Sequence, residues 1–478
     1  MHMAMKDNRR GLWRATGLWF GFWLVLLTLV FGTIAIIYSL IEPRGRLARQ
    51  VGRVWARLLL KLAGVRLEVV GLENLVPGQT YVYAASHRSQ FDIFALLAGL
   101  PEDFGWVAKK SLFQIPVFGQ ALSRMGNIPV DRSNLQQAIR SLNHGAALVR
   151  GGRSVIIFPE GKLTRSGLMD TFARGMERIA QRANVPVVPA HLDGLWGTWT
   201  SHAPRRALSW WPRLRRRIDF RLAAPLPADT SAAAARRAVQ ELGWRLAEER
   251  AAADRRTLGR TVLRRARWSP RRIAVRDADG ALSLFALCAT AQVLRRLLGL
   301  AEDERHVGVL MPPGRGGTLV NLALAFAGRT AVNLNHTAGA AQVARMCELA
   351  GIRTIVTAKL YRTRIGDPQL PGRCIDLEDL KPQLTKPRIL WQGILNLLLP
   401  ACWRDAGHPG DAATIVFSSG STGDPKGVAL THRNIHANAD AAFLALDVRR
   451  DDCLLSPLPL FHSFGVSTGM WLGLTAGI

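Results

Sequence analysis

A histidine and an aspartate with four residues between them follow an apolar run in the segment TYVYAASHRSQFD. The run is typical of a buried strand, and His87 and Asp92 stand where that strand is expected to turn into a helix. A neutral imidazole can take a proton from an alcohol, and a carboxylate on its other nitrogen fixes the tautomer and stabilises the imidazolium. We interpret the pair as a general base and its orienting partner for acyl transfer to a hydroxyl. The spacing by itself also fits a structural histidine.

Three further segments carry polar residues after apolar runs. GNIPVDR ends in Arg132, and VIIFPEGKLTRSG places Glu160, Gly161, Lys162 and Arg165 in a turn after a strand. VPVVPAHLDG follows as the last of the series. Together with the His/Asp segment, these blocks resemble the four motifs of the glycerophospholipid acyltransferase family, which includes the lysophosphatidate acyltransferases.

The resemblance covers residues 65–224 and implies a role for each block. His87 would be the general base on the glycerol hydroxyl and Asp92 its partner, with a thioester of CoA or acyl carrier protein as donor and no cofactor. Arg132 and the Glu160–Gly161 turn would hold the glycerol phosphate, because guanidinium groups and open backbone N–H groups bind phosphate. For Arg132 alone, a surface ion pair is the alternative.

The third block departs from the family pattern Phe-Pro-Glu-Gly-Thr-Arg. Lys162 takes the threonine position and Leu163 the arginine position, so Lys162 or Arg165 would have to supply the charge. A similar variation occurs in bifunctional proteins that join a lysophosphatidylethanolamine acyltransferase to an acyl-carrier-protein synthetase. We therefore predict a lysophospholipid acceptor of the 2-acylglycerophosphoethanolamine kind. The alternatives are 1-acylglycerol-3-phosphate as acceptor and a non-catalytic basic membrane adaptor.

A Ser/Thr/Gly-rich turn stands near the C-terminus in TIVFSSGSTGDPKGVALTH. Backbone N–H groups and hydroxyls in such a turn can bind oxyanions. It differs from a Walker A loop, because the spacing from Gly420 to Lys426 is longer by one residue and Gly427 replaces the Ser/Thr.

This turn resembles the phosphate loop of the adenylate-forming acyl-CoA and acyl-carrier-protein synthetases, and PLPLFHSFG matches their next motif. The resemblance implies ATP and Mg²⁺ as cofactors if the domain is complete, with His462 at the junction of the acyl and nucleotide sites. The residues expected at the nucleotide are Ser418, Ser419, Gly420, Ser421, Thr422, Gly423 and Lys426. Later motifs of that family are not found before Ile478, so we expect an incomplete domain without competent acyl adenylation.

Residues 15–41 contain no charged side chain and are long enough to cross a hydrocarbon core. We predict a retained anchor, either one pass or a hairpin, with a buried soluble helix as the alternative. Arginines flank the run on both sides, and their bias favours an inner-membrane location with the catalytic domains in the cytoplasm. Residues 51–63 resemble a basic amphipathic helix suited to anionic headgroups.

The rest of the chain alternates apolar runs with helical patterns, which predicts an α/β fold in both halves. The apolar stretch 389–403 contains a proline and is too short to span a membrane, so we expect it in the core or at an interface. The predicted segments are 1–60 (anchor and basic segment), 61–228 (acyltransferase domain), 229–262 (helical connector) and 263–478 (partial AMP-binding domain).

The composition is strongly basic, with 63 Lys and Arg against 35 Asp and Glu and a formal charge of +28. Such an excess favours an anionic partner, and without a nucleic-acid motif we predict a phospholipid membrane and no nucleic acid. The five cysteines are scattered without zinc-ligand spacing. We therefore predict reduced, mostly buried thiols and no metal.

Overall fold

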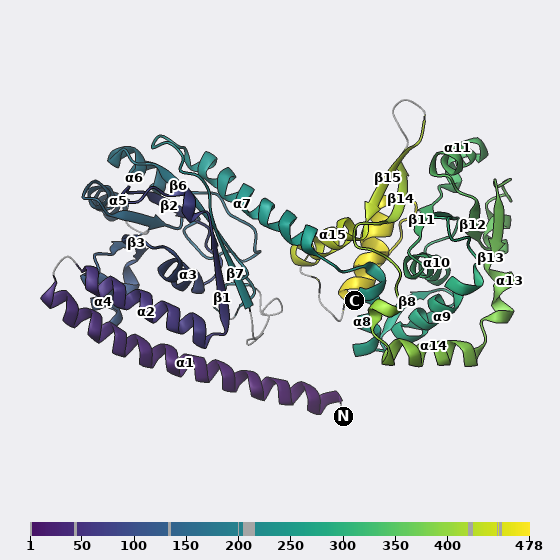
Figure 1. The fold of residues 1–478 in the computed structure, drawn as a ribbon, viewed down its shortest axis with the longest axis horizontal. Helices are drawn as coiled ribbons and strands as arrows, with labels where there is room; N and C mark the ends of the chain where they lie inside the picture. Colours follow the sequence, from purple (N-terminus) through teal and green to yellow (C-terminus); the bar gives the residue numbers. More distant parts are fainter. Residues whose placement is uncertain are drawn as a thin grey trace. The chain divides into compact units, whose positions relative to one another are not determined.

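The computed structural model of the chain forms two compact units, Met1–Glu248 and Glu249–Ile478. It describes residues 2–42, 45–131, 135–198, 200–203, 216–418, 424–446, 448 and 452–478. Each unit is built of helices around a mainly parallel sheet, which confirms the predicted α/β class (Figure 1). The finer division into four segments stays a prediction.

The first unit is organised around a seven-stranded sheet in the order β1-β7-β6-β2-β5-β3-β4. Neighbouring strands are parallel, except for the antiparallel pair of β6 and β7. The central strands β2 and β5 are buried on both faces, as expected for a parallel sheet covered by helices. The strands are β1 (Val65–Val70), β2 (Val82–Ala85), β3 (Phe104–Lys109), β4 (Ile128–Val130), β5 (Ser154–Ile157), β6 (Val187–Asp193) and β7 (Arg216–Leu222).

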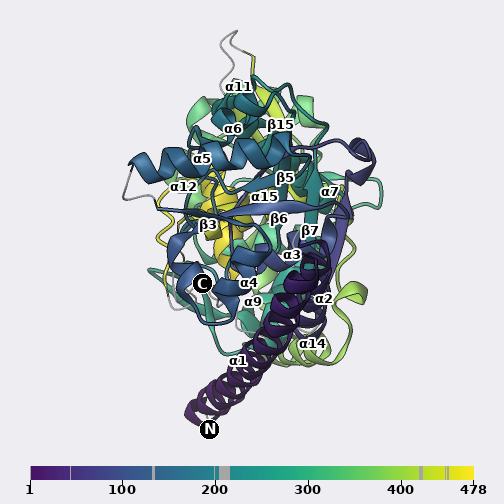
Figure 2. The ribbon, with the colours of Figure 1, turned by 90° about the vertical axis from the view of Figure 1, so that its left-hand side faces the viewer.

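Helices cover both faces of this sheet (Figure 2). Tyr81, Tyr83 and Ala85 point into a core shared with α1, α2 and α3, while Val82 and Ala84 point into a second core shared with α5, α6 and α7. This alternation is the period of two that a strand imposes. The helices are α1 (His2–Ile41), α2 (Arg46–Leu62), α3 (Phe91–Gly99), α4 (Phe118–Arg124), α5 (Leu135–Arg150), α6 (Gly175–Ala183) and α7 (Ala232–Ala253).

Within α1, the segment Gly17–Ile41 is the one described stretch that is long and apolar enough to cross a membrane, and it is mostly exposed. Helix α2 begins earlier than predicted, and its apolar face does not point outward to headgroups. Trp55 and Leu59 are buried, and the Trp55 ring packs edge-on against Phe94 of α3 with 5.1 Å between centroids. The apolar face of α2 is therefore buried within the unit, because neighbouring helices offer it an apolar surface.

The second unit contains a six-stranded sheet in the order β13-β12-β10-β11-β14-β15, and a hairpin of β8 (Ile273–Asp277) and β9 (Gly280–Ser283). The pairs within the six-stranded sheet are parallel except β14 with β15. The strands of the sheet are β10 (His306–Val309), β11 (Thr330–Asn333), β12 (Thr354–Thr357), β13 (Arg373–Asp376), β14 (Ala412–Ser418) and β15 (Lys426–Thr431).

The helices of the second unit enclose a core in which Trp471 and Phe326 are fully buried. Thr257 caps the first of them by accepting a hydrogen bond from the Arg260 N–H, so that the predicted helical connector is broken before Leu258. The main helices are α8 (Leu258–Trp268), α9 (Leu284–Leu297), α10 (Arg315–Phe326), α11 (Ala340–Ala350), α12 (Lys359–Arg364), α13 (Leu377–Leu380), α14 (Lys386–Leu398), α15 (His432–Ala445) and α16 (Gly473–Ala476).

Candidate active site

His87 and Asp92 meet in the loop between β2 and the first turn of α3. His87 Nδ1 lies 2.9 Å from Asp92 Oδ2, and the same oxygen accepts the backbone N–H of Arg88 at 2.6 Å and of Ser89 at 2.9 Å. The Asp92 side chain is fully buried. Since an ionised carboxylate only accepts, Nδ1 carries the proton and Nε2 is left as the basic nitrogen.

The imidazole is also held by aromatic rings. His87 stacks on Phe158 with 3.9 Å between ring centroids and 14° between planes, and Phe158 in turn stacks on Trp106 at 5.9 Å. The His87 side chain is 14% exposed, and Phe158 covers one face of its ring. The geometry suits a general base with a fixed orientation.

Glu160 links the third block to the first. Its carboxylate accepts hydrogen bonds from the backbone N–H groups of His87 and Asp170, each at 2.9 Å. Burial raises the pKa of this carboxyl group. Gly161 has φ of 75° and donates its N–H to the Phe158 carbonyl at 3.0 Å. That N–H is used within the turn, and the phosphate-binding role of the Glu160–Gly161 turn stays a prediction. Glu160 shapes the loop that carries His87.

The basic residues of the third block lie differently from one another. Lys162 lines the cavity described below, with Nζ 3.0 Å from the Asp170 carboxylate, and Leu163 beside it is buried in the cavity wall. Arg165 is exposed and does not line that cavity. Arg132 lies outside the described residues.

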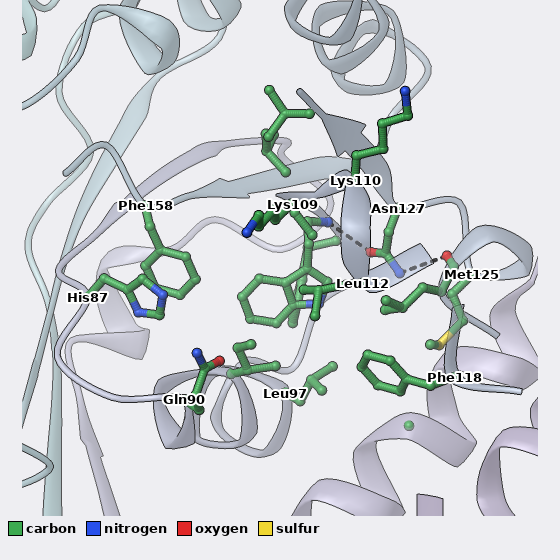
Figure 3. A pocket seen from close by; sticks show the side chains of 18 of the residues that line it. His87, Gln90, Leu97, Lys109, Lys110, Leu112, Phe118, Met125, Asn127 and Phe158 are labelled. Atoms are coloured by element: carbon green, nitrogen blue, oxygen red, sulfur yellow. Dashed lines mark hydrogen bonds between the residues drawn. The ribbon is translucent and has the colours of Figure 1, made fainter. Parts of the chain in front are cut away.

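A cavity of about 860 Å³ opens beside His87. His87 and Phe158 stand at one end and Phe118 and Met125 at the other, with Leu97 and Leu112 between them (Figure 3). The volume of the cavity and its mostly apolar wall suit a large apolar ligand. Lys109 and Lys110 also line it.

The cavity wall also contains a charged cluster that the sequence did not indicate. Arg153 donates to the carbonyls of Phe104 and Gly126 at 2.8 and 3.0 Å, and burial lowers its pKa to about 10. Glu102 accepts the hydroxyls of Tyr83 and Ser154, and burial raises its pKa to about 7. These residues are scattered in sequence and match no motif, so only the tertiary structure brings them together.

In the second unit, Ser418 and Lys426 face each other across the β14–β15 pair, and both are exposed. Between them, the predicted residues Ser419, Gly420, Ser421, Thr422 and Gly423 lie outside the described part of the chain. His462 is exposed and accepts the Phe464 N–H at 3.2 Å.

Metal-ligating residues do not gather in the described ranges, where no group of three His, Cys, Asp or Glu side chains is placed to hold an ion. The thiols are less uniformly buried than predicted. Cys288 and Cys347 are buried, Cys374 is half-buried and Cys453 is exposed.

Comparison with known proteins distinguishes the two units. The acyltransferase family matches residues 66–193, and the AMP-binding enzyme family matches residues 266–478. A 1-acyl-sn-glycerol-3-phosphate acyltransferase of Pseudomonas aeruginosa is 36% identical over 171 residues, which are 34% of this chain and 66% of that protein. The chloroplastic 1-acyl-sn-glycerol-3-phosphate acyltransferase BAT2 of Brassica napus is 32% identical over 172 residues, which are 36% of this chain and 49% of that protein.

Among solved structures, the 1-acyl-sn-glycerophosphate acyltransferase PlsC of Thermotoga maritima is 21% identical, with 50% of this chain and 97% of that chain covered at a TM-score of 0.41. The chain spans between about half and two thirds of the length of the two curated relatives.

Proposed function

We propose that the chain, which matches the acyltransferase family over residues 66–193 and the AMP-binding enzyme family over residues 266–478, transfers an acyl group from a thioester to the free hydroxyl of 1-acylglycerol-3-phosphate. The observation that carries this proposal is the His87–Asp92 pair at the end of an apolar cavity. The acceptor follows the names of the two curated relatives, which favour the alternative reading of the sequence over the ethanolamine lysophospholipid.

In this reaction His87 acts on the acceptor hydroxyl. Nε2 takes the hydroxyl proton while the oxygen attacks the thioester carbonyl, and the carbon–sulfur bond then breaks. The departing sulfur takes the proton back from the imidazolium, so the histidine returns to its neutral form. Asp92 stays ionised throughout and stabilises the imidazolium.

The cavity has different surroundings for the acyl chain and for the phosphate of the reactants. Its apolar wall would hold an acyl chain, while Lys109, Lys110 and Lys162 would attract the phosphate. Each lysine is a flexible point charge, which suits a phosphate monoester without demanding one fixed geometry.

The test is acyl transfer by the detergent-solubilised full chain, without ATP, from acyl-CoA and from acyl carrier protein to 1-acylglycerol-3-phosphate. His87→Ala should lower the rate by about 10²- to 10⁴-fold, the usual contribution of general-base catalysis. His144→Ala is the matched control, because His144 is exposed on α5 and does not line the cavity. Equal activity of the two variants would overturn the proposal.

A second acceptor, the ethanolamine lysophospholipid, is favoured by two observations. Leu163 stands in the cavity wall where the family pattern has arginine, and an AMP-binding unit that could charge a carrier is part of the same chain. The same assay decides between the acceptors, since a higher kcat/KM for the ethanolamine lipid would replace the first proposal with this one.

For the second unit we propose ATP binding, the step with which ATP-dependent fatty acid activation begins. Ser418, Lys426 and the residues between them would hold the phosphates, His462 would lie beside the acyl group, and Mg²⁺ would accompany the nucleotide. The fit rests on the exposed residues Ser418 and Lys426, which are register partners at the loop end of the β14–β15 hairpin. ATP binding by the full chain that is unchanged in Lys426→Ala would contradict it.

We further propose that the chain works at the inner membrane with both units in the cytoplasm. Gly17–Ile41 is long and apolar enough to cross the bilayer, and arginines flank it. Protease protection of tags placed at the two ends in sealed inside-out vesicles tests this, because a protected C-terminus would exclude the proposed orientation.

A further inference from the structure

Helix α14 in the second unit is amphipathic in the opposite sense to a helix of a soluble domain. Its buried residues are Gln392, Gly393 and Asn396. Its exposed residues include Leu390, Trp391, Ile394 and Leu398. A helix on a water-exposed surface normally buries its apolar stripe, so this orientation needs a reason.

The inward orientation is fixed by close packing on α9. A Cβ at Gly393 would lie 2.1 Å from the ring of Phe285, so only glycine allows the helix to approach this closely. On the same face Gln392 donates to the Asn396 side chain at 3.2 Å, and both residues are buried. The small and polar side of α14 is therefore the packed side, and its apolar side is left outward.

Two tryptophans extend the outward surface. Trp268 at the end of α8 is 81% exposed and Trp403 in the short helix after α14 is 71% exposed. Helix α8 packs against both α14 and that short helix, so the elements that carry these residues are neighbours in the unit. Figure 1 shows α8 beside α14. We call this region the α14 face; it comprises Trp268, Leu390, Trp391, Ile394, Leu398 and Trp403.

The α14 face has basic surroundings. A cavity of about 380 Å³ between α8 and the end of α14 is lined by four arginines, Arg255, Arg260, Arg264 and Arg267. Among the described residues, no acidic side chain pairs with Arg255, Arg264 or Arg267. Neither α8 nor α14 contains an aspartate or glutamate, and α14 opens with Lys386 and Arg388.

We propose that the α14 face is a docking surface for an anionic lipid bilayer. The 13 residues of α14 rise about 20 Å, too short to span, so the helix lies in the plane of the interface with its leucines and tryptophans among the upper acyl chains. The arginines between α8 and α14 hold the phosphates of acidic headgroups. The charge selects this occupant, since a purely apolar protein partner would leave unpaired arginines at the rim.

This inference concerns the second unit and does not rest on the acyl transfer proposed for the first. It also does not use the apolar segment of α1, whose presence in a bilayer would tether the chain whether or not the α14 face reaches the lipid. The experiment must therefore report the depth of α14 itself, because co-sedimentation of the chain with vesicles would reflect any tether.

The test places an environment-sensitive fluorophore at Leu398→Cys in the full chain, in a background of Cys374→Ser, Cys402→Ser and Cys453→Ser. The chain is reconstituted into vesicles of phosphatidylcholine with phosphatidylglycerol, with or without bromine on the acyl chains. Leu360→Cys on α12 is the matched control, because Leu360 is an equally apolar exposed residue of the same unit. The background variant without an added cysteine is treated in the same way and shows how much fluorophore the remaining buried thiols take up.

The expected result is an emission shift to shorter wavelength and loss of intensity on brominated chains at position 398, with neither change at 360. Arg264→Glu should weaken both changes at 398, whereas Arg364→Glu on α12 should not. A water-like probe at 398 in these vesicles would overturn the proposal. Equal quenching at position 360 would also overturn it. A probe at 398 whose emission is already shifted in detergent and is insensitive to bromine would overturn it as well, because a protein partner would then cover the face.

Discussion

Replacing Asp92 by asparagine isolates the part of catalysis that comes from a buried negative charge. One carboxylate oxygen of Asp92 accepts hydrogen bonds from the His87 Nδ1–H and from the backbone N–H groups of Arg88 and Ser89. The amide oxygen of asparagine can keep the two backbone hydrogen bonds, so we expect the loop to retain its shape. The change then removes the charge beside the imidazole and little else.

The size of the effect follows from the contact. Opposite unit charges about 4 Å apart attract by about 4 kcal/mol at an effective dielectric constant of 20. A neutral hydrogen bond to the amide would retain about 1 kcal/mol of this stabilisation. The imidazolium in the transition state therefore loses about 3 kcal/mol, which corresponds to about a 10²-fold fall in kcat. The loss acts on the charged histidine, so KM should change little.

The assay is steady-state acyl transfer at saturating thioester, with Asp193→Asn as the matched control. Asp193 pairs with Arg88 at 2.5 Å and does not contact the imidazole. We expect the control to keep kcat within a few fold. Full activity of Asp92→Asn would refute the role of the buried charge, and an equal loss in Asp193→Asn would show that the loop as a whole, not the charge beside His87, governs the rate.

Three further changes test other parts of the first unit. Lys162→Ala breaks an exposed pair with Asp170 and should leave the thermal midpoint unchanged; if Lys162 binds the phosphate, KM for 1-acylglycerol-3-phosphate rises about tenfold, a loss of about 1.5 kcal/mol, and an unchanged KM removes it from the site. Gly119→Ala places a Cβ 2.2 Å from the Phe113 carbonyl oxygen and should destabilise the unit by about 1–3 kcal/mol in thermal unfolding, whereas Gly21→Ala, with nothing within 4 Å, should not. Burial raises the pKa of Glu102 from 4.5 to about 7, so the folded state holds the proton more tightly, and stability should fall as pH rises through this window and then level off; Glu102→Gln should remove that fall in denaturation curves, and a parallel pH dependence of both proteins would exclude Glu102 as its source.

The chemistry of the first site was readable from residue types in order along the chain. His87 and Asp92 could be paired from the sequence because a short loop between a strand and a helix keeps residues at its two ends close together. Phe158 and Glu160 illustrate the limit. The ring that stacks on His87 and the carboxylate that holds its backbone come from a strand end more than seventy residues away. Their contact depends on the order of strands in the sheet.

Helix α14 shows a different limit. Its sequence reads as an apolar stretch that fits either a core or an interface, and the pattern does not tell which face is packed. Gly393 decides which face of α14 is buried, because its lack of a side chain lets the helix approach Phe285. Gln392 and Asn396 then point inward. Close approach depends on the shape of the neighbouring helix, which local sequence does not contain.

The sequence by itself determined the α/β class, the long apolar segment in α1, the motif residues and the kind of reaction, because these depend on residue type and short-range spacing. The tertiary structure decided which face of α2 and α14 is buried, that the Gly161 N–H is used within its own turn, and that Glu102 and Arg153 meet at one cavity. These outcomes depend on contacts between segments distant in the chain, where packing and desolvation outweigh local preference.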